Sequence, residues 1–174
     1  MNGIILYQSK YGATKKYAQW LSEVTGFACI ETKKADIRQV AQYDTIIFGG
    51  GVYASGVAWL SFLRKNYEKL KEKKLIIFCV GASPYDETTV QQAARHNLKK
   101  DLLGIPFFYC RGAWDEEAMG FTDRTLCKML QKAIAKQDPS TFEPWMVALM
   151  SARGQKCDWT DKKYLAPILN ELSI

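Results

Sequence analysis

The sequence predicts an α/β fold, a three-layer α/β/α doubly wound sandwich with a five-stranded parallel sheet. Two observations support this class. Short continuous apolar runs recur along the chain, as expected of strands that are buried on both faces. Stretches with apolar residues at helical spacing lie between these runs, and right-handed crossovers between parallel strands place such helices on both faces of the sheet.

The elements follow in order from these patterns. The apolar runs that we expect to form strands are 4–7, 27–30, 45–48, 75–80 and 105–110. The stretches that we expect to form helices are 13–25, 57–70, 88–103, 123–136 and 160–172. In the second of these helices, Leu60, Leu63 and Leu70 share one face. Gly26 is a natural stop for the first helix, and Thr160 is the expected N-cap of the last one.

Length and hydropathy bound the domain organisation and the location. The 174 residues favour a single domain, 1–174, with one sizeable core. No apolar run approaches the ~20 residues that a membrane-spanning helix needs. Residues 1–10 lack the basic region and the small-residue cleavage site of a signal peptide. These features predict a cytoplasmic protein.

The cysteines and the single histidine give no indication of a metal site. The five cysteines are odd in number and none has C-x-x-C spacing, so reduced thiols are the first interpretation and a disulfide or a zinc site is the weaker alternative. His96 alone cannot form a multi-histidine site. It lies in a polar, helix-like stretch, which favours a surface residue over a general acid. We therefore predict no metal ion.

The charge of the chain bears on its partners. A formal net charge of +6 suggests acidic partners, anionic substrates or peripheral contact with an anionic membrane surface. A lysine-rich solvated surface is an equally good interpretation of runs such as 71–74. No basic stripe is interleaved with aromatic residues, so we predict no nucleic-acid partner.

The first expected strand is followed by a polar loop, residues 9–14. In an open parallel sheet, ligands bind beyond the carboxyl ends of the strands, and a helix that starts there offers free N–H groups and a positive dipole end to a phosphate. A capped helix start without a ligand is the alternative. The P-loop and G-x-G-x-x-G motifs are both absent. The candidate anion-binding residues of loop 9–14 are Ser9, Lys10, Tyr11, Gly12, Ala13 and Thr14.

Two further loops are expected at the same edge of the sheet. Glycines at a strand end let a flat ligand lie against the backbone, and tyrosines can stack on a ring. Ordinary turns are the alternative, with Pro84 as the first residue of a helix. The candidate ring contacts are Gly50, Gly51, Val52, Tyr53, Ala54 and Ser55 in loop 50–55, and Gly81, Ala82, Ser83 and Tyr85 in loop 81–85. Together with loop 9–14, they predict a site for a phosphorylated flat ring.

These residues resemble the flavodoxin superfamily, whose phosphate loop follows [ST]-x-[ST]-G-x-T. The stretch S-K-Y-G-A-T matches it except at Tyr11, which removes one hydroxyl donor. The chain is most similar to the bacterial flavodoxin-like protoporphyrinogen IX dehydrogenases, which pass electrons to a quinone and have S-x-x-G-x-T. The further residues that carry this resemblance are Arg111, Gly112, Ala113, Asp123, Arg124, Gly154, Asp158, Thr160 and Asp161. The resemblance implies the strand order 2-1-3-4-5 and FMN as the cofactor.

The segment after the fifth strand departs from that branch. It reads W-D-E-E-A-M-G from Trp114 to Gly120, whereas the branch has arginines and aromatic residues there. Three consecutive acids would repel the propionates of a porphyrin. Trp114 either covers the flavin or packs in the interior.

Two functional hypotheses follow from the resemblance. In the first, the chain is an FMN oxidoreductase that transfers electrons between a small organic substrate, such as a protoporphyrinogen, and a quinone or other acceptor. In the second, it is an electron carrier that docks on a redox partner protein. A fold that binds no flavin is a weaker third interpretation, supported by Tyr11 alone. A flavin carries the redox chemistry itself, so we predict no catalytic side chain.

Overall fold

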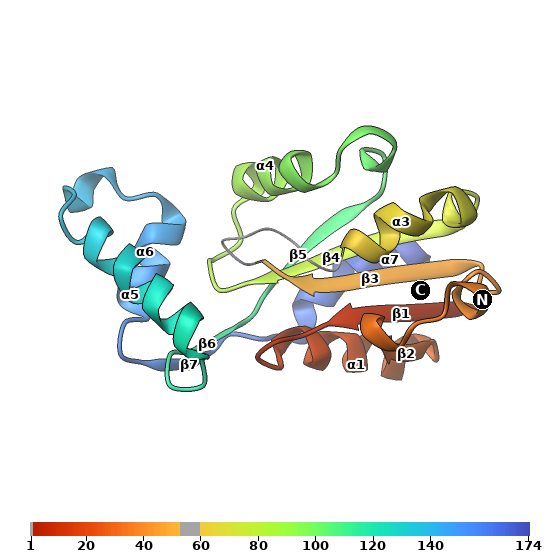
Figure 1. The fold of residues 1–174 in the computed structure, drawn as a ribbon, viewed down its shortest axis with the longest axis horizontal. Coiled ribbons are helices and arrows are strands. Elements are labelled where there is room, and N and C mark those ends of the chain that lie inside the picture. The colour runs from red at the N-terminus through yellow and green to blue at the C-terminus, as the bar shows by residue number, and fades with distance from the viewer. Residues whose placement is uncertain (1, 53–59) are drawn as a thin grey trace.

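The computed structural model describes residues 2–52 and 60–174 (Figure 1). Five parallel strands form one sheet in the order β2-β1-β3-β4-β5. The strands are β1 (Gly3–Gln8), β2 (Ala28–Glu31), β3 (Thr45–Gly51), β4 (Lys74–Gly81) and β5 (Phe107–Arg111). The helices that flank this sheet are α1 (Ala13–Thr25), α2 (Ile37–Val40), α3 (Leu60–Leu70), α4 (Glu87–Asn97) and α7 (Ala166–Leu172). The doubly wound sandwich and its strand order are confirmed.

Alternate residues of the central strands face opposite helical layers, because side chains alternate along a strand. On one face, Ile4 and Leu6 of β1 pack in a cluster with residues of α2 and α3. On the other face, Ile5 of β1 packs in a second cluster with residues of α1 and α7. Both faces of β1 are therefore buried, which explains its uninterrupted apolar run.

The first helix begins and ends at glycines. Gly12 is the N-cap residue of α1, and Gly26 follows its end in the left-handed conformation with φ 71°. The N–H of Gly26 donates to the carbonyl of Ser22 at 2.8 Å. The predicted extent of this helix and its stop are confirmed.

The third strand was expected to end at residue 48 and loop 50–55 to start at Gly50, and both bounds are wrong. Gly49, Gly50 and Gly51 are the last residues of β3, and all three are buried. A Cβ atom at Gly49 would lie 2.2 Å from the ring of Phe78 on β4. Glycine is needed there so that this ring can cross the strand, which is a packing reason that a turn-forming run does not reveal.

Two predicted boundaries in the second half are also wrong. The helix expected to reach residue 103 ends at Asn97, and a short 3-10 turn, Lys100–Leu102, follows it. The last helical segment begins with a 3-10 turn, Lys162–Leu165, whose N-cap is Asp161, not Thr160. The carboxylate of Asp161 accepts from the N–H of Lys163 at 2.9 Å, while Thr160 donates its hydroxyl to Asp158.

Residues 113–158 form a satellite unit that was not predicted as such. It contains β6 (Ala113–Asp115), α5 (Phe121–Ile134), a 3-10 turn (Pro139–Thr141), α6 (Pro144–Ser151) and β7 (Lys156–Asp158). β6 and β7 pair as an antiparallel two-stranded sheet. Figure 1 shows α5 and α6 beside the main sheet, on the side to which β1 and β3 point. This unit has an apolar cluster of its own, apart from the two clusters of the main sheet. The single domain expected over 1–174 stays a prediction.

Candidate functional site

Loop 9–14 joins the carboxyl end of β1 to the start of α1. Its turn depends on Gly12, whose φ of 97° is unfavourable for residues with a Cβ atom. The N–H of Gly12 donates to Oγ of Ser9 at 3.1 Å, and Gly12, as the N-cap residue, has no side chain with which to cap α1. The first N–H groups of a helix have no intrahelical acceptor. The start of α1 therefore presents backbone donors and a positive dipole end at the edge of the sheet.

Lys10 and Tyr11 of this loop both contact Asp123 at the start of α5. The ammonium group of Lys10 and the hydroxyl of Tyr11 each donate to Oδ2 of Asp123. The Tyr11 hydroxyl also accepts from the N–H of Gly120 at 3.4 Å. The hydrogen bond from Lys10 holds the pKa of the Asp123 carboxyl below its ordinary value, and the same bond raises the pKa of Lys10. Both groups are therefore charged at neutral pH.

The contact with Asp123 was missed from the sequence. It joins residues that are 112 and 113 positions apart, and no local pattern connects them. The signal was Tyr11 itself, which stands where the resembled loop has a short hydroxyl residue. Its longer side chain reaches out of the loop to the satellite unit.

Loop 50–55 is described only in part. Gly50 and Gly51 belong to β3, and Val52 is partly exposed just beyond it. The N–H of Val52 donates to the carbonyl of Val80 at 2.9 Å. The remaining candidates of this loop, Tyr53, Ala54 and Ser55, lie outside the described residues.

Loop 81–85 is held by side chains and backbone from β5 and its extension. Three consecutive carbonyls each accept one hydrogen bond. The pairs are Gly112 N–H to Gly81 at 2.7 Å, Arg111 Nε to Ala82 at 3.2 Å, and the Tyr109 hydroxyl to Ser83 at 2.6 Å. Hydrogen bonds from residues 109–112 therefore fix the position of the first three residues of this loop.

Tyr85 is the exposed aromatic residue of loop 81–85. Its side chain is 57% exposed, and its ring lies 6.4 Å from that of Tyr109 with an interplanar angle of 53°. Exposed rings at such an edge can stack on a planar ligand. Pro84 does not start α4, because the N-cap is Asp86, whose carboxylate accepts from the N–H of Thr89 at 2.7 Å.

Trp114 lies on β6 and is only 9% exposed. It packs in the cluster of the satellite unit with Ile134, Leu149 and Ala152. Its indole nitrogen is buried, and it has no hydrogen-bond partner among the described residues. This position fits the packing interpretation of Trp114.

The three consecutive acids that follow Trp114 are largely engaged by their own segment. Asp115 forms an ion pair with Lys156 at 2.9 Å and accepts from the N–H groups of Glu117 and Ala118. Glu116 accepts from the side-chain amide of Gln131 at 2.8 Å. The acids therefore close a turn as well as carry charge.

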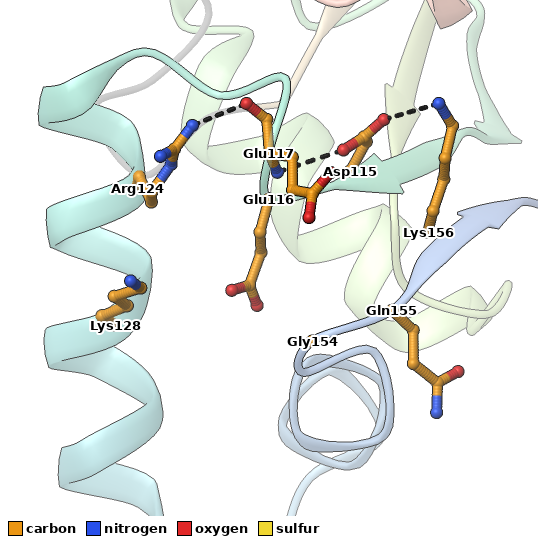
Figure 2. Close-up of a pocket in the computed structure, with 8 residues that line it drawn as sticks. All are labelled: Asp115, Glu116, Glu117, Arg124, Lys128, Gly154, Gln155 and Lys156. Atoms are coloured by element: carbon orange, nitrogen blue, oxygen red, sulfur yellow. Dashed lines mark hydrogen bonds and ion pairs between the residues drawn. The ribbon is translucent and has the colours of Figure 1, made fainter.

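A charged cavity of about 320 Å³ lies between this turn, α5 and β7 (Figure 2). Its basic residues roughly balance its acidic ones. The lining residues are Asp115, Glu116, Glu117, Arg124, Lys128, Gly154, Gln155 and Lys156. The guanidinium of Arg124 donates to the carbonyls of Glu117 and Met119 at 2.6 and 3.0 Å, so it also holds the turn.

The described residues contain neither a helix that could span a membrane nor a cluster of metal ligands. None of the helices in residues 2–52 and 60–174 is long and apolar enough to span a bilayer. Within the same part of the chain, no three His, Cys, Asp or Glu side chains gather in a way that could hold a metal ion.

Comparisons with known proteins give a family. The family described as the flavodoxin domain matches residues 4–141. No functionally curated protein matches the chain. Among solved structures, a two-electron reduced flavodoxin of Megasphaera elsdenii is 19% identical and has a TM-score of 0.47, covering 62% of this chain and 82% of its own. A Trp repressor binding protein of Bacillus subtilis is 16% identical with a TM-score of 0.45, covering 64% and 83%. An archaeal flavodoxin is 16% identical with a TM-score of 0.41, covering 75% and 93%.

Proposed function

This chain belongs to the flavodoxin domain family, and we propose that it binds FMN at the carboxyl edge of its main sheet. The start of α1 carries this proposal. It combines a glycine N-cap at φ 97°, which has no side chain to cap α1, with the hydroxyl groups of Ser9 and of Thr14, which is only 3% exposed. Backbone N–H groups, hydroxyls and the ammonium of Lys10 are the donors that a phosphate monoester prefers. The donor set of loop 9–14 therefore fits the phosphate of FMN.

The ring of FMN would be held by the other two loops. Gly50 and Gly51 keep the end of β3 free of side chains, so that a flat ring can approach the backbone there. Ala82 and Ser83 would border the ring, and Tyr85 would stack on it. The proposal leaves Trp114 in the interior of the satellite unit.

When bound, FMN supplies one-electron or two-electron transfer. The chain would bind and orient it, and the hydrogen bonds to the carbonyls of residues 81–83 would keep the ring edge in place. We propose that the protein transfers electrons between a small organic substrate and a quinone or another acceptor. A protoporphyrinogen remains one candidate substrate, because Asp115 and Glu116 already have partners within the chain.

An electron carrier that docks on a redox partner protein is the second candidate. It is favoured by the prediction that no side chain acts as an acid or base. FMN-loaded protein assayed with menaquinone and protoporphyrinogen separates the two candidates. Turnover would support the oxidoreductase, and its absence with every small acceptor would support the carrier.

The surface of α5 favours an acceptor at a membrane. Large apolar side chains point outward from this helix, and a row of exposed lysines runs beside them. The apolar residues are Phe121, Leu126, Met129 and Leu130, with exposures of 86%, 54%, 62% and 40%; the lysines are Lys128 and Lys132 on α5, and Lys136 just after its end. Apolar and basic strips on one helix are typical of helices that lie on anionic lipid. A second copy of the chain would bring like charges together. We thus propose a cytoplasmic protein that contacts the anionic membrane surface through α5.

Titration of the flavin-free protein with FMN, followed by flavin fluorescence, tests the cofactor proposal. We expect saturation at one FMN per chain. Fluorescence that rises from the first addition just as it does for FMN in buffer would contradict it.

A further inference from the structure

The satellite unit holds two lysines around the start of α1 by means of two carboxylates. Asp123, at the start of α5, accepts from Lys10, which is the only basic residue of loop 9–14. Asp158, at the end of β7, accepts from Lys16 at 2.9 Å, and Lys16 also donates to Thr160 at 2.7 Å. Lys16 lies one helical turn further along, since its N–H donates to the carbonyl of Gly12. Only the first pair involves loop 9–14 itself.

Asp123 is well placed to act on an anion in that loop. Its side chain is about one-quarter exposed, at 26%, so water screens its charge incompletely. It engages both Lys10 and Tyr11, which are consecutive residues of the loop. A phosphate that enters the loop meets this negative charge, and the lysine that would neutralise the phosphate is already paired with Asp123.

We infer that Asp123 is a specificity-determining residue of the proposed flavin site, which competes with the ligand's phosphate for Lys10 and so weakens the binding of anionic flavins relative to uncharged ones. This inference rests on the proposed function. FMN carries a phosphate dianion, whereas riboflavin has the same ring and an uncharged hydroxyl. The carboxylate of Asp123 therefore penalises FMN and leaves riboflavin untouched.

Tyr11, the residue that departs from the resembled phosphate loop, contacts the same carboxylate. A short hydroxyl residue at that position would turn its donor to the phosphate. Tyr11 instead donates to Asp123 and accepts from the N–H of Gly120, so this side chain ties the loop to the satellite unit. With Tyr11 at this position, the loop has one donor fewer for a phosphate, and the carboxylate of Asp123 is held beside it.

The test compares two ligands and two matched variants. Dissociation constants of FMN and riboflavin are measured for the wild type, Asp123→Asn and Asp158→Asn. Removing a like charge from a partly buried site is expected to tighten FMN binding about tenfold in Asp123→Asn. Riboflavin affinity should stay within about twofold, because no phosphate is present to be repelled. Asp158→Asn removes an equal charge from the same unit without freeing Lys10, so its FMN affinity should change less than that of Asp123→Asn.

A second substitution and a second ligand keep the test decisive. Lys10→Gln should weaken FMN binding strongly in the Asp123→Asn background and only slightly in the wild type, because Asp123 already neutralises Lys10 there. Inorganic phosphate, followed by the thermal shift it causes, reports on loop 9–14 without the ring. If Asp123→Asn folds poorly, Asp123→Ser takes its place, provided that its thermal midpoint equals that of the wild type.

The outcomes separate this inference from the proposed function. If FMN saturates the wild type and Asp123→Asn with equal or lower affinity in the variant, the cofactor stands and the inference is overturned. If the wild type ignores FMN while Asp123→Asn gains inorganic phosphate binding, the proposed function fails together with the flavin specificity, and only the exclusion of anions from loop 9–14 by Asp123 stands. If no variant binds FMN or phosphate, both are overturned.

Discussion

The main sheet and the satellite unit differ in how completely they bury their apolar side chains. In the main sheet, the central strands β1, β3 and β4 are buried on both faces, and α3 buries Leu60, Leu63 and Leu70 against the sheet. In the satellite unit, α5 buries Gln131 and Ile134 and leaves most of its apolar residues exposed. We therefore expect stability to reside in the sheet, and we propose that the satellite unit supplies surfaces and charges that act on ligands and partners. The four predictions that follow test this division.

Matched isoleucine truncations test where the stability lies. Ile47 of β3 is fully buried, and Ile134 of α5 is 1% exposed. Ile47→Ala should lower the free energy of unfolding of the whole chain by about 3 kcal/mol, because a core cavity is left behind. Ile134→Ala should speed amide exchange in β6 and β7 while β1 and β3 stay protected. Equal loss of protection in both regions would contradict the division.

A glycine pair tests the crossing of β3 by Phe78. Gly49→Ala would place a Cβ atom 2.2 Å from that buried ring, so we expect a loss of about 2 kcal/mol in the free energy of unfolding from overpacking. Gly104→Ala is the control, because nothing lies within 4 Å of a Cβ atom there. Urea unfolding measures both variants. A Gly49→Ala protein as stable as Gly104→Ala would show that β3 and β4 pack differently.

Vesicle binding tests the surface of α5. Sedimentation with vesicles that contain anionic lipid should retain the protein, and vesicles of neutral lipid should retain less. Replacing both Leu126 and Met129 with Gln should weaken binding about tenfold, because two apolar side chains no longer enter the interface. Val24→Gln on α1 is the control, since Val24 is also half exposed but lies outside α5. Equal weakening by the control variant would argue against a specific face.

The smallest expected effect concerns the contact of the satellite unit with α1. A hydrogen bond from Thr160 and the ion pair with Lys16 hold the pKa of Asp158 at about 2, below its ordinary value. A carboxyl group with a lowered pKa stabilises the fold at pH values above its ordinary pKa. This stabilisation is lost as the pH falls from about 4 toward about 2. Because the pair is largely exposed, we expect less than about 1 kcal/mol. Asp158→Asn should flatten that part of the pH profile of urea unfolding; an unchanged profile would assign it to other carboxyls.

The sequence predicted the main sheet because each of its signals is local. Continuous apolar runs marked the strands, and Gly26 marked the end of α1. The end of β3 was misjudged because the ring that requires glycine at residue 49, Phe78, lies on another strand. Thr160 was misjudged because its hydroxyl is used by Asp158.

The satellite unit was harder to predict because its contacts are not local. β6 and β7 are three residues each, and forty positions separate the end of one from the start of the other. The candidate loops 9–14 and 81–85 were placed from strand ends alone, and their assignment to a ligand stays a prediction. The contact of Asp123 with Lys10 could only be found from the structure.

The central claim is that FMN binds through loop 9–14, and Gly12→Ala tests it most directly. This substitution forces a Cβ atom onto a residue at φ 97°, while the surrounding space stays open. We expect the wild type to bind one FMN per chain in a visible titration, and Gly12→Ala to bind it at least tenfold more weakly while keeping its affinity for riboflavin. Equal FMN affinity in the two proteins would contradict the claim. A wild type that retains no yellow colour once unbound FMN is removed would also contradict it.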